Sequence, residues 1–465
     1  MYKYFIVIIL TLGILLFPKV ILASDRNIFG LHLTQTSDID DAAKIVNSNG
    51  GDWGWATIVI RTDQLDYQTW QDFFNKCRKY HIIPIIRLAT INQNGVWKKP
   101  EYADIDNLAN FLNSLNWPTL DQHIILFNEV NHAQEWGGTV DPKSYTDISI
   151  YAIQKFKSLN SHFILLSAGL DLAAPQKLPD FESAENFINV VTQYNREYWQ
   201  QIDGIASHSY PNHGFVGTPN DSGEHSILGY QWELATLKNF GITKNFPVYI
   251  TETGWPHREG ESNNNIFYTT TTTASFLIDA LSKWQKDDRV VAVTPFIFNY
   301  PYAPFDHFSW IDKSEIIYPA YQKVIDLPKN ANQPEQLFKY ISVKIQLPLF
   351  MFPNNEYSGQ LILKNEGQSI WGEKKSQFCL IPQASSNITL DSLCSDDQQI
   401  VPGQTETFSF KFKLGSQQEN SFLSWQGLPH FEINSVLPMI TNAQIYRPEN
   451  GIIDRIKRFY YEVFK

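Results

Sequence analysis

Two glutamates follow apolar runs that are typical of buried strands. Glu129 lies at the end of HIILFNEV, residues 123–130, and Glu252 lies near the end of FPVYITETGWP, residues 246–256. A pair of carboxyl groups can divide the work of breaking a polar bond, because one donates a proton to the leaving group while the other attacks or activates water. This chemistry requires a fold that brings the two residues together.

Apolar runs alternate with segments of helical periodicity through most of the chain. The runs span residues 29–33, 56–61, 82–90, 123–130, 163–170, 203–211, 246–256 and 290–300, and the helical segments span 38–49, 67–80, 104–115, 143–160, 182–198, 230–240, 270–284 and 319–325. Continuous apolar runs are typical of strands buried on both faces, and strand-helix alternation predicts parallel pairing. Eight such units over about 300 residues predict an α/β fold of the (β/α)8 TIM barrel type. A doubly wound open sheet is disfavoured, because no glycine-rich phosphate turn follows the first run.

Polar and aromatic residues lie at or near the C-terminal ends of most of these runs. In a barrel, these positions face the active site. The residues are His32, Arg61, Arg87, Asn128, Glu129, His208, Tyr210, Glu252, Trp255, Asn299 and Tyr300. Carboxylates that end the fourth and seventh strands lie on opposite sides of a barrel mouth, so a sugar chain can pass between them. The pattern therefore favours glycoside hydrolysis.

Two motifs at these strand ends resemble a known group of enzymes. FNEV (127–130) and ITETGWP (250–256) resemble the catalytic signatures of the retaining (β/α)8 glycoside hydrolases of clan A. The second motif is most similar to glycoside hydrolase family 17, the β-1,3-glucan hydrolases, and the resemblance covers about residues 28–325. It implies Glu129 as general acid/base, Glu252 as nucleophile and Asn128 as the partner of the sugar 2-hydroxyl. His208 and Tyr210 in HSY resemble the clan's His-x-Tyr, in which the tyrosine hydrogen-bonds the nucleophile.

The sequence departs from the family 17 pattern at several positions. Phe127 stands where the family usually has Gly, and His257 stands where it has Ser or Thr. The tryptophan expected at the end of the eighth strand is absent from FIFNYP, and Trp310 is the candidate sugar platform in its place. Sugar and linkage specificity, endo or exo action, and hydrolysis or transglycosylation all stay open.

Cations and rings near the pair supply further candidates for substrate binding. Arg87 is favoured over Arg61 as the cation that keeps Glu252 ionised, and the set also contains His32, Trp255, Asn299 and Trp310. Trp53 and Trp55, which precede the second strand, fit core packing and sugar stacking equally well. The sequence contains no HExxH motif and no Cys-His cluster, so we expect neither a metal nor another cofactor.

Charge and the first residues of the chain bear on its partners and location. The net charge of −11 does not suit nucleic acid, which requires a basic face. Residues 1–24 combine Lys3, an apolar run over 4–17 and small residues near Ala23, a pattern typical of a signal peptide; an uncleaved anchor is the alternative. We therefore expect a secreted or cell-surface protein whose partner is a polysaccharide or oligosaccharide. Membrane contact is expected only through an uncleaved N-terminal segment or the C-terminal tail.

The sequence changes character after residue 325. Residues 326–336, rich in Pro, Asn and Gln, predict a linker, and short alternating strands over 337–445 predict an all-β sandwich that resembles immunoglobulin-like domains. Residues 446–465 predict an amphipathic tail. Cys379 and Cys394 can pair within the sandwich, whereas Cys77 is expected to be a buried small hydrophobe. A spacer role for the sandwich is preferred over a binding role.

Two classes of function compete. The first is an exported retaining glycoside hydrolase, or a transglycosylase, that acts on β-linked polysaccharide by double displacement. The second is a catalytically inactive barrel that binds glycan. The enzyme is favoured, because a binding protein does not need both Glu129 and Glu252 together with Asn128 and Tyr210.

Overall fold

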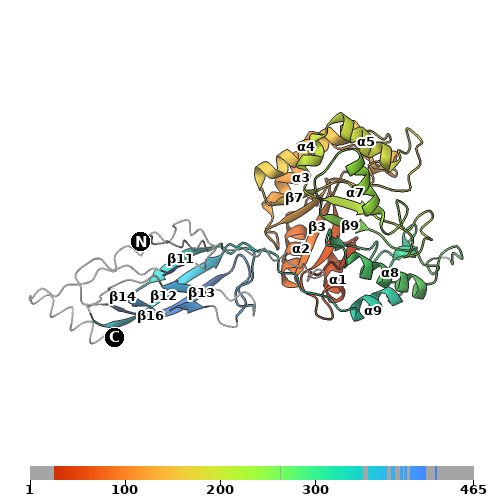
Figure 1. Ribbon diagram of the computed structural model, residues 1–465. Helices are drawn as coiled ribbons and strands as arrows, with labels where there is room; N and C mark the ends of the chain where they lie inside the picture. Colours follow the sequence, from red (N-terminus) through yellow and green to blue (C-terminus); the bar gives the residue numbers. More distant parts are fainter. Residues whose placement is uncertain are drawn as a thin grey trace, which may run out of the picture.

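The computed structural model describes residues 26–261, 263–348, 354–373, 379–382, 388–390, 392–394, 398–414 and 425–426 of the chain. These residues form an α/β part and a part built of antiparallel strands (Figure 1). The expected signal peptide at 1–24 and the expected tail at 446–465 lie outside the described residues. Within the described ranges, no helix has the length and apolar character that crossing a membrane requires.

The α/β part contains two parallel sheets whose strands overlap the expected apolar runs. The five-stranded sheet has the order β1 (Gly30–Leu33), β2 (Gly54–Arg61), β3 (Ile82–Ala89), β6 (Gln122–Ile125), β7 (Phe163–Leu166), and the three-stranded sheet has the order β10 (Val290–Val293), β9 (Val248–Glu252), β8 (Ile205–His208). Single parallel bridges, Phe29 with Val293 and Leu166 with Gly204, link the outer strands of one sheet to those of the other. The α/β class with parallel strands is thus confirmed.

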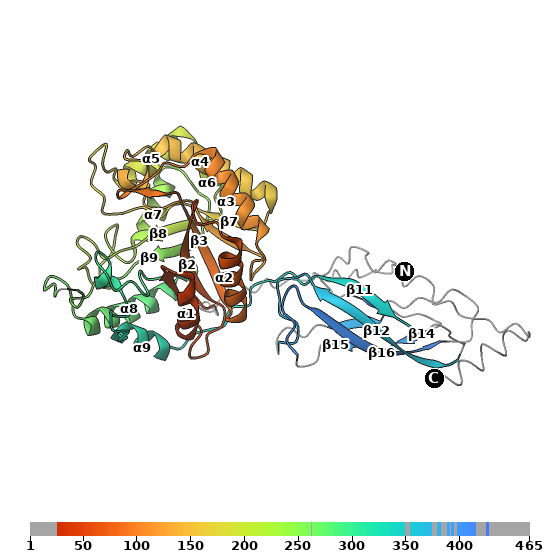
Figure 2. The same ribbon diagram turned by 180° about the vertical axis from the view of Figure 1, so that it is seen from behind.

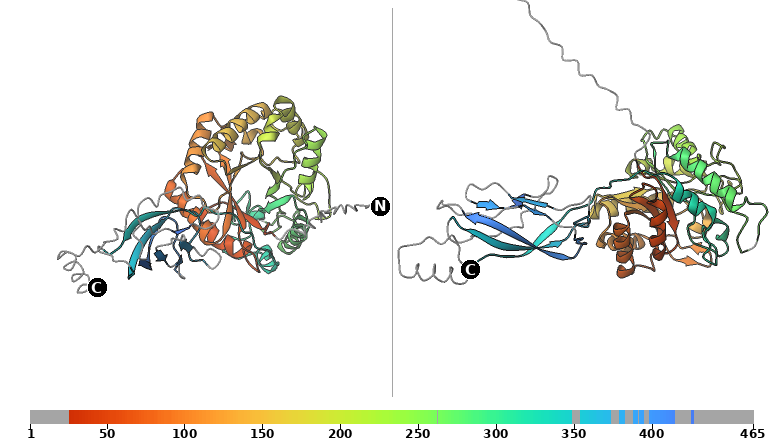
Figure 3. Two further views of the ribbon diagram at one scale, coloured as in Figure 1. Left: turned by 60° about the vertical axis from the view of Figure 1, so that its left-hand side comes forward. Right: turned by 90° about the horizontal axis from the view of Figure 1, so that it is seen from below.

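Helices connect the strands and lie around them (Figure 3, left). They are α1 (Ile39–Val46), α2 (Tyr67–Lys79), α3 (Tyr102–Ser114), α4 (Pro142–Leu159), α5 (Ala184–Tyr194), α6 (Glu197–Gln201), α7 (Gly229–Asn239), α8 (Thr270–Trp284) and α9 (Pro319–Asp326), with short 3-10 turns η1 (Thr36–Asp38), η2 (Ala133–Glu135) and η3 (Asp306–Phe308) and a small hairpin of β4 (Asn92–Gln93) and β5 (Val96–Trp97). The prediction of a single helix over 182–198 is wrong, because this segment forms two helices, α5 and α6. At the division, Asn195 adopts an extended backbone and its side chain accepts a hydrogen bond from the Glu197 N–H at 3.1 Å.

Both faces of the parallel strands are buried, which explains why their sequences read as continuous apolar runs. Ile86 and Ile124 point to the layer between strands and helices, where they join one large hydrophobic cluster. Ile85, Ile125 and Tyr249 point the other way and join a second cluster formed mainly by strand residues. Isoleucines that are neighbours in the sequence therefore pack in two different hydrophobic clusters.

The remaining strands pair antiparallel. One sheet has the order β11 (Tyr340–Gln346), β12 (Glu356–Asn365), β16 (Thr405–Leu414), β14 (Ile388–Leu390), and the other has the order β15 (Leu393–Cys394), β13 (Cys379–Pro382), β17 (Trp425–Gln426). Exposed and buried residues alternate along most of β12, where Leu361 and Leu363 pack in a cluster with Phe410. A disulfide joins Cys379 to Cys394. Cys77 of α2 is a buried free thiol.

The antiparallel strands lie to one side of the α/β part, beside α2 (Figures 1 and 2). The segment expected to be a linker packs on the α/β part: the Asn332 side chain donates to the carbonyls of Asn27 at 2.7 Å and Trp53 at 2.8 Å. Beyond it, the Gln368 side chain of the antiparallel part donates to the Thr119 carbonyl at 2.9 Å. Asn27, Trp53 and Thr119 all precede strands, so these contacts lie at the N-terminal ends of the parallel strands.

Candidate active site

Glu252 and Glu129 are positioned at the opposite, C-terminal ends of the strands. Glu252 is the last residue of β9, and Glu129 lies just beyond β6. The chain after β6 stays beside β7, because the Glu129 N–H donates to the Gly169 carbonyl at 2.9 Å. Phe127 and Glu129 on either side of Asn128 have φ angles of 74° and 27°, values that are uncommon for residues with a side chain. Strained backbone of this kind clusters at functional sites.

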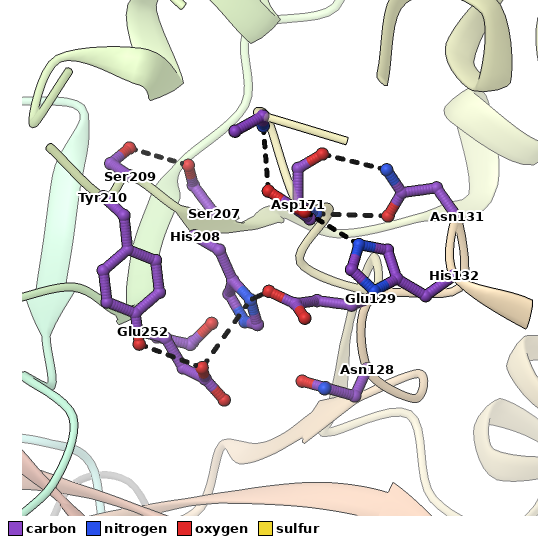
Figure 4. A network of polar contacts seen from close by, with 12 residues as sticks. Asn128, Glu129, Asn131, His132, Asp171, Ser207, His208, Ser209, Tyr210 and Glu252 are labelled. Atoms are coloured by element: carbon purple, nitrogen blue, oxygen red, sulfur yellow. Dashed lines mark hydrogen bonds and ion pairs between the residues drawn. The ribbon is translucent and has the colours of Figure 1, made fainter. Parts of the chain in front are cut away.

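His208 lies between the two glutamates (Figure 4). This last residue of β8 has its Nδ1 2.9 Å from Glu129 Oε1 and 3.8 Å from Glu252 Oε2. The contacting atoms of the three side chains all lie within 4.8 Å of one another. Gly169 makes this possible, because a Cβ at that position would lie 2.2 Å from His208 Cδ2. The fold therefore brings Glu129 and Glu252 as close together as their predicted chemistry requires.

Glu252 is buried but held in its ionised form. Its Oε1 accepts a hydrogen bond from Arg87 Nη1 at 3.1 Å and its Oε2 accepts one from the Tyr210 hydroxyl at 3.2 Å. Burial alone raises the pKa of Glu252, but the charges of His208 and Arg87 and the Tyr210 hydrogen bond outweigh burial and lower it. A buried carboxylate with these donors is suited to act as a nucleophile.

Arg87 is the cation at the site, and Arg61 is not. Arg87 Nη1 donates both to Asn128 Oδ1 and to Glu252 Oε1, so it joins the two motif strands. Arg61 instead forms a bidentate pair with Asp63 at 2.6 and 2.9 Å near the surface. The preference for Arg87 as the residue close to Glu252 agrees with this placement.

The two buried histidines at the site differ in charge. His32 Nδ1 lies 3.4 Å from the Thr251 carbonyl and 3.9 Å from Glu252 Oε1, and burial lowers its pKa to about 4. Burial also works to lower the pKa of His208, but Glu252 and the hydrogen bond with Glu129 outweigh it, and the pKa is raised. His32 is therefore a neutral neighbour of the pair, whereas His208 carries positive charge at acidic pH.

Three predicted substrate-binding residues are not beside the carboxylates. Trp255 and Trp310 are only 5% and 6% exposed, and both line a pocket of about 20 Å³, which holds about one water molecule. The Trp310 ring is thus buried in the structure, and its role as a sugar platform stays a prediction. The Asn299 side chain donates a hydrogen bond to Asp38 at 3.4 Å.

Trp53, just before β2, and Trp55, near the start of β2, pack at the N-terminal end of the strands. Trp53 stacks on His81 with ring centroids 4.5 Å apart and an interplanar angle of 3°. Trp55 donates to the Asn27 carbonyl at 2.9 Å and contacts the Tyr249 ring edge-to-face. These contacts favour core packing over sugar stacking as the role of Trp53 and Trp55.

A third carboxyl lies at the site and was not predicted. Glu135 ends η2, and its neighbours include Asn128, Arg87 and both candidate catalytic glutamates. Burial, together with the charges of Glu129 and Glu252, raises the pKa of Glu135 to about 7, against the opposing effects of Arg87 and Asn128. The signal available in the sequence is the dense polar stretch NEVNHAQE, which directly follows an apolar strand.

Glu129, His208 and Glu252 also offer three ligand atoms that a cation could bridge. The same atoms already have protein partners, since Glu252 accepts from Arg87 and Tyr210 while Glu129 pairs with His208. A guanidinium at 3.1 Å supplies positive charge where a bound cation would supply it. In the structure the two carboxylates are thus balanced by protein donors.

Comparison with known proteins gives matches to solved structures alone. No family model matches the chain, and no curated protein matches it. Similar solved structures include a family 39 glycoside hydrolase from Bacteroides cellulosilyticus WH2 (TM-score 0.46, 13% identity, 84% of this chain and 82% of that chain), a GH128 endo-β-1,3-glucanase from Sorangium cellulosum (0.43, 13%, 65% and 98%) and the GH53 catalytic domain from Ignisphaera aggregans (0.45, 15%, 66% and 97%). All three are glycoside hydrolases by name. At these TM-scores the similarity does not establish a function for this chain. The function is therefore inferred from the geometry of the candidate site.

Proposed function

We propose that the protein is an exported retaining glycoside hydrolase that cleaves β-linked polysaccharide by double displacement. The observation that carries the proposal is the closeness of Glu129 and Glu252, which have carboxyl oxygens within 4.8 Å of each other. Retaining enzymes need the two carboxyl groups about 5–5.5 Å apart, whereas inverting enzymes hold them about 6.5–9.5 Å apart to admit a water molecule. The separation favours retention.

The proposal includes a closed (β/α)8 barrel. The bridges Phe29–Val293 and Leu166–Gly204 support closure, because they join the two parallel sheets at both junctions. Active sites of such barrels lie at the C-terminal ends of the strands, where Glu252, His208 and Glu129 are found.

In the first step, Glu252 attacks the anomeric carbon while Glu129 protonates the leaving glycosidic oxygen. Arg87 and Tyr210 keep the attacking carboxylate ionised and oriented, since each donates to one of its oxygens. In the second step Glu129 takes a proton from water, and that water releases the sugar from Glu252. His208 contacts both carboxylates and lies close to the path of the proton.

Asn128 is placed to bind the sugar next to the cleaved bond. Its Oδ1 accepts from Arg87, which leaves the amide N–H groups as its donors. A hydrogen bond from this amide to the 2-hydroxyl strengthens in the transition state and supports the chemical step.

Export rests on the expected signal peptide at 1–24 and is compatible with the Cys379–Cys394 disulfide, because such bonds persist mainly outside the cytosol. The mass of the protein recovered from its producing cell checks this part of the proposal. A chain that keeps residues 1–24 and is found in the cytosol would contradict it.

The decisive experiment measures sugar release from a panel of β-1,3-, β-1,4- and mixed-linkage glucans, mannan and galactan. We expect wild-type protein to act on one polymer, and Glu129→Gln and Glu252→Gln to lose about two to four orders of magnitude in kcat. Glu185→Gln, which neutralises an exposed glutamate in the first turn of α5, serves as the control and keeps full activity. NMR of the first reducing ends formed is expected to show the β anomer.

Other results would change the proposal in defined ways. An initial α anomer would replace double displacement with inversion. Products longer than the substrate would identify a transglycosylase. Absence of turnover on every polymer, with binding intact in all variants, would indicate a glycan-binding protein.

A further inference from the structure

The backbone that carries Glu129 is held in an uncommon conformation. Phe127 and Glu129 have φ angles of 74° and 27°. Residues with a side chain persist in this region only where surrounding contacts fix them. The contacts of this segment therefore decide where the Glu129 carboxyl lies.

Backbone and amide hydrogen bonds attach the segment to the chain that follows β7. The Glu129 N–H donates to the Gly169 carbonyl at 2.9 Å, and the His132 N–H donates to the Glu129 carbonyl at 2.8 Å. The Asn131 side chain donates to the Asp171 carbonyl at 2.9 Å and accepts from the Asp171 N–H at 3.1 Å. The two segments thus lie side by side at the C-terminal ends of their strands.

An ion pair joins side chains of the same two segments (Figure 4). His132 Nε2 lies 2.8 Å from Asp171 Oδ2, and the other oxygen of this carboxylate accepts from the Ala173 N–H at 2.8 Å. The His132 ring also packs edge-to-face on Phe181 with centroids 4.9 Å apart. Both partners of the pair are therefore fixed by contacts of their own.

Both members of this pair are charged at mildly acidic pH. Burial works to lower the pKa of His132, but the hydrogen bond with Asp171 and the charge of Glu129 outweigh burial and raise it. Burial works to raise the pKa of Asp171, but the hydrogen bonds with His132 and from the Ala173 N–H outweigh burial and lower it. Charge-assisted hydrogen bonds are roughly twice as strong as neutral ones, so the pair is a strong attachment between the two segments.

Asp171 also lies beside the strand end that carries His208. The backbones of Asp171 and His208 form a parallel bridge, and His208 Nδ1 lies 2.9 Å from Glu129 Oε1. Glu129 is thus held at two points: its carboxyl contacts His208, and its carbonyl accepts from the His132 N–H. Asp171 contacts both histidines, one through its backbone and the other through its side chain.

We propose that His132 and Asp171 are a positioning pair that fixes Glu129 for proton transfer to the leaving glycosidic oxygen. The inference rests on the proposed function and adds two residues to it. The pair acts through the backbone of Glu129 and not on the substrate. Without it, the strained segment keeps its backbone hydrogen bonds but loses the side-chain contact that joins it to the end of β7.

The test compares two substrates that differ in their need for a proton. One is the polymer that wild type cleaves, and its leaving oxygen needs the proton of Glu129. The other is an aryl glycoside of the same sugar with 2,4-dinitrophenol as the leaving group, which departs as a stable anion with the electron pair of the broken bond. Loss of proton donation therefore lowers kcat/KM on the polymer alone.

The variants are Asp171→Asn and the double variant Asp171→Asn/His132→Gln. In both we expect kcat/KM on the polymer to fall about ten- to hundredfold, and kcat/KM on the dinitrophenyl glycoside to stay unchanged. The double variant keeps the net charge of the pair, so an effect of charge alone on Glu129 would disappear in it. Asp121→Asn is the matched control and should change neither value, because Asp121 pairs with His162 at 3.4 Å at the opposite ends of β6 and β7.

Three results would overturn the proposal. Equal losses on the two substrates would show a general structural role of the pair. An unchanged kcat/KM on the polymer in Asp171→Asn would show that Glu129 does not need the pair. Full recovery in the double variant would show that the charge of Asp171, and not the position of Glu129, matters.

Hydrogen exchange of backbone amides gives a readout without turnover. In Asp171→Asn we expect the amides of Glu129 and His132 to exchange about tenfold faster, while the amides within β7 stay unchanged. If wild type cleaves no polymer, the proposed function fails while this measurement still decides on the pair. Unchanged exchange at both amides would reject the inference.

Discussion

Arg87 controls the charge of Glu252 through a direct hydrogen bond of 3.1 Å. In Arg87→Met the nearest guanidinium is lost, so the pKa of Glu252 rises. Because the nucleophile must be ionised, activity would then be lost at a higher pH as the solution is acidified. We expect the acidic limb of kcat/KM to move up by about 1–2 pH units. Arg61→Met is the matched control, since Arg61 pairs with Asp63 away from the site; equal profiles for the two variants would remove Arg87 from the mechanism.

The residues that the sequence could name are those at strand ends. Glu252 and His208 end their strands and Arg87 lies near the end of β3, so the strand pattern alone places them on one face. Trp310 could not be placed, because a large ring after a strand can turn inward to the core as readily as outward to a ligand. Glu135 could not be found for a related reason: its position depends on the hydrogen bonds of a loop, which no periodicity records.

At the level of elements, the approach of β8 to the end of β7 sets the position of His208. Gly169 permits this approach, since an added Cβ would lie 2.2 Å from the His208 ring. We expect Gly169→Ala to displace His208, to lower kcat at least tenfold and to cost about 1–3 kcal/mol of folding free energy. Gly403→Ala in the antiparallel part is the control: its φ of 89° makes the substitution destabilising, but no atom lies within 4 Å of its Cβ.

Assays well below both melting temperatures separate the two effects. Full activity in Gly403→Ala with reduced activity in Gly169→Ala is expected, and full activity in both would show that the position of His208 does not depend on the close approach of β8 to Gly169.

The order of strands and helices could be predicted from the sequence, because burial of both faces gives β3 and β6 their unbroken apolar runs. The break between α5 and α6 could not be predicted from the sequence. The spacing of apolar residues remains helical across the break, and the helix ends because of a local hydrogen bond to the Asn195 side chain.

At the level of the whole molecule, the antiparallel part and the candidate active site lie at opposite ends of the parallel strands. Gln368 meets the Thr119 carbonyl before β6, whereas Glu129 lies after it. The antiparallel part is therefore placed where it leaves the approach to Glu129 and Glu252 open. This arrangement supports a spacer role over a direct part in binding at the site.

Arg78 at the end of α2 holds the two parts together. Its buried guanidinium donates to the carbonyls of Asn116 at 2.8 Å and Trp117 at 3.1 Å and to that of Gln368 in the antiparallel part. Arg78→Met removes the guanidinium donor from the Trp117 and Gln368 carbonyls, while the Asn116 carbonyl keeps the bond from Gln71 at 3.2 Å. We therefore expect a loss of about 2–4 kcal/mol, a lower melting temperature and faster proteolysis within 327–339, with kcat unchanged below that temperature. The control Lys76→Met, which breaks a surface pair on the same helix, should change neither melting nor proteolysis, because exposed pairs contribute little. Equal protease resistance in both variants would show that other contacts hold the parts together.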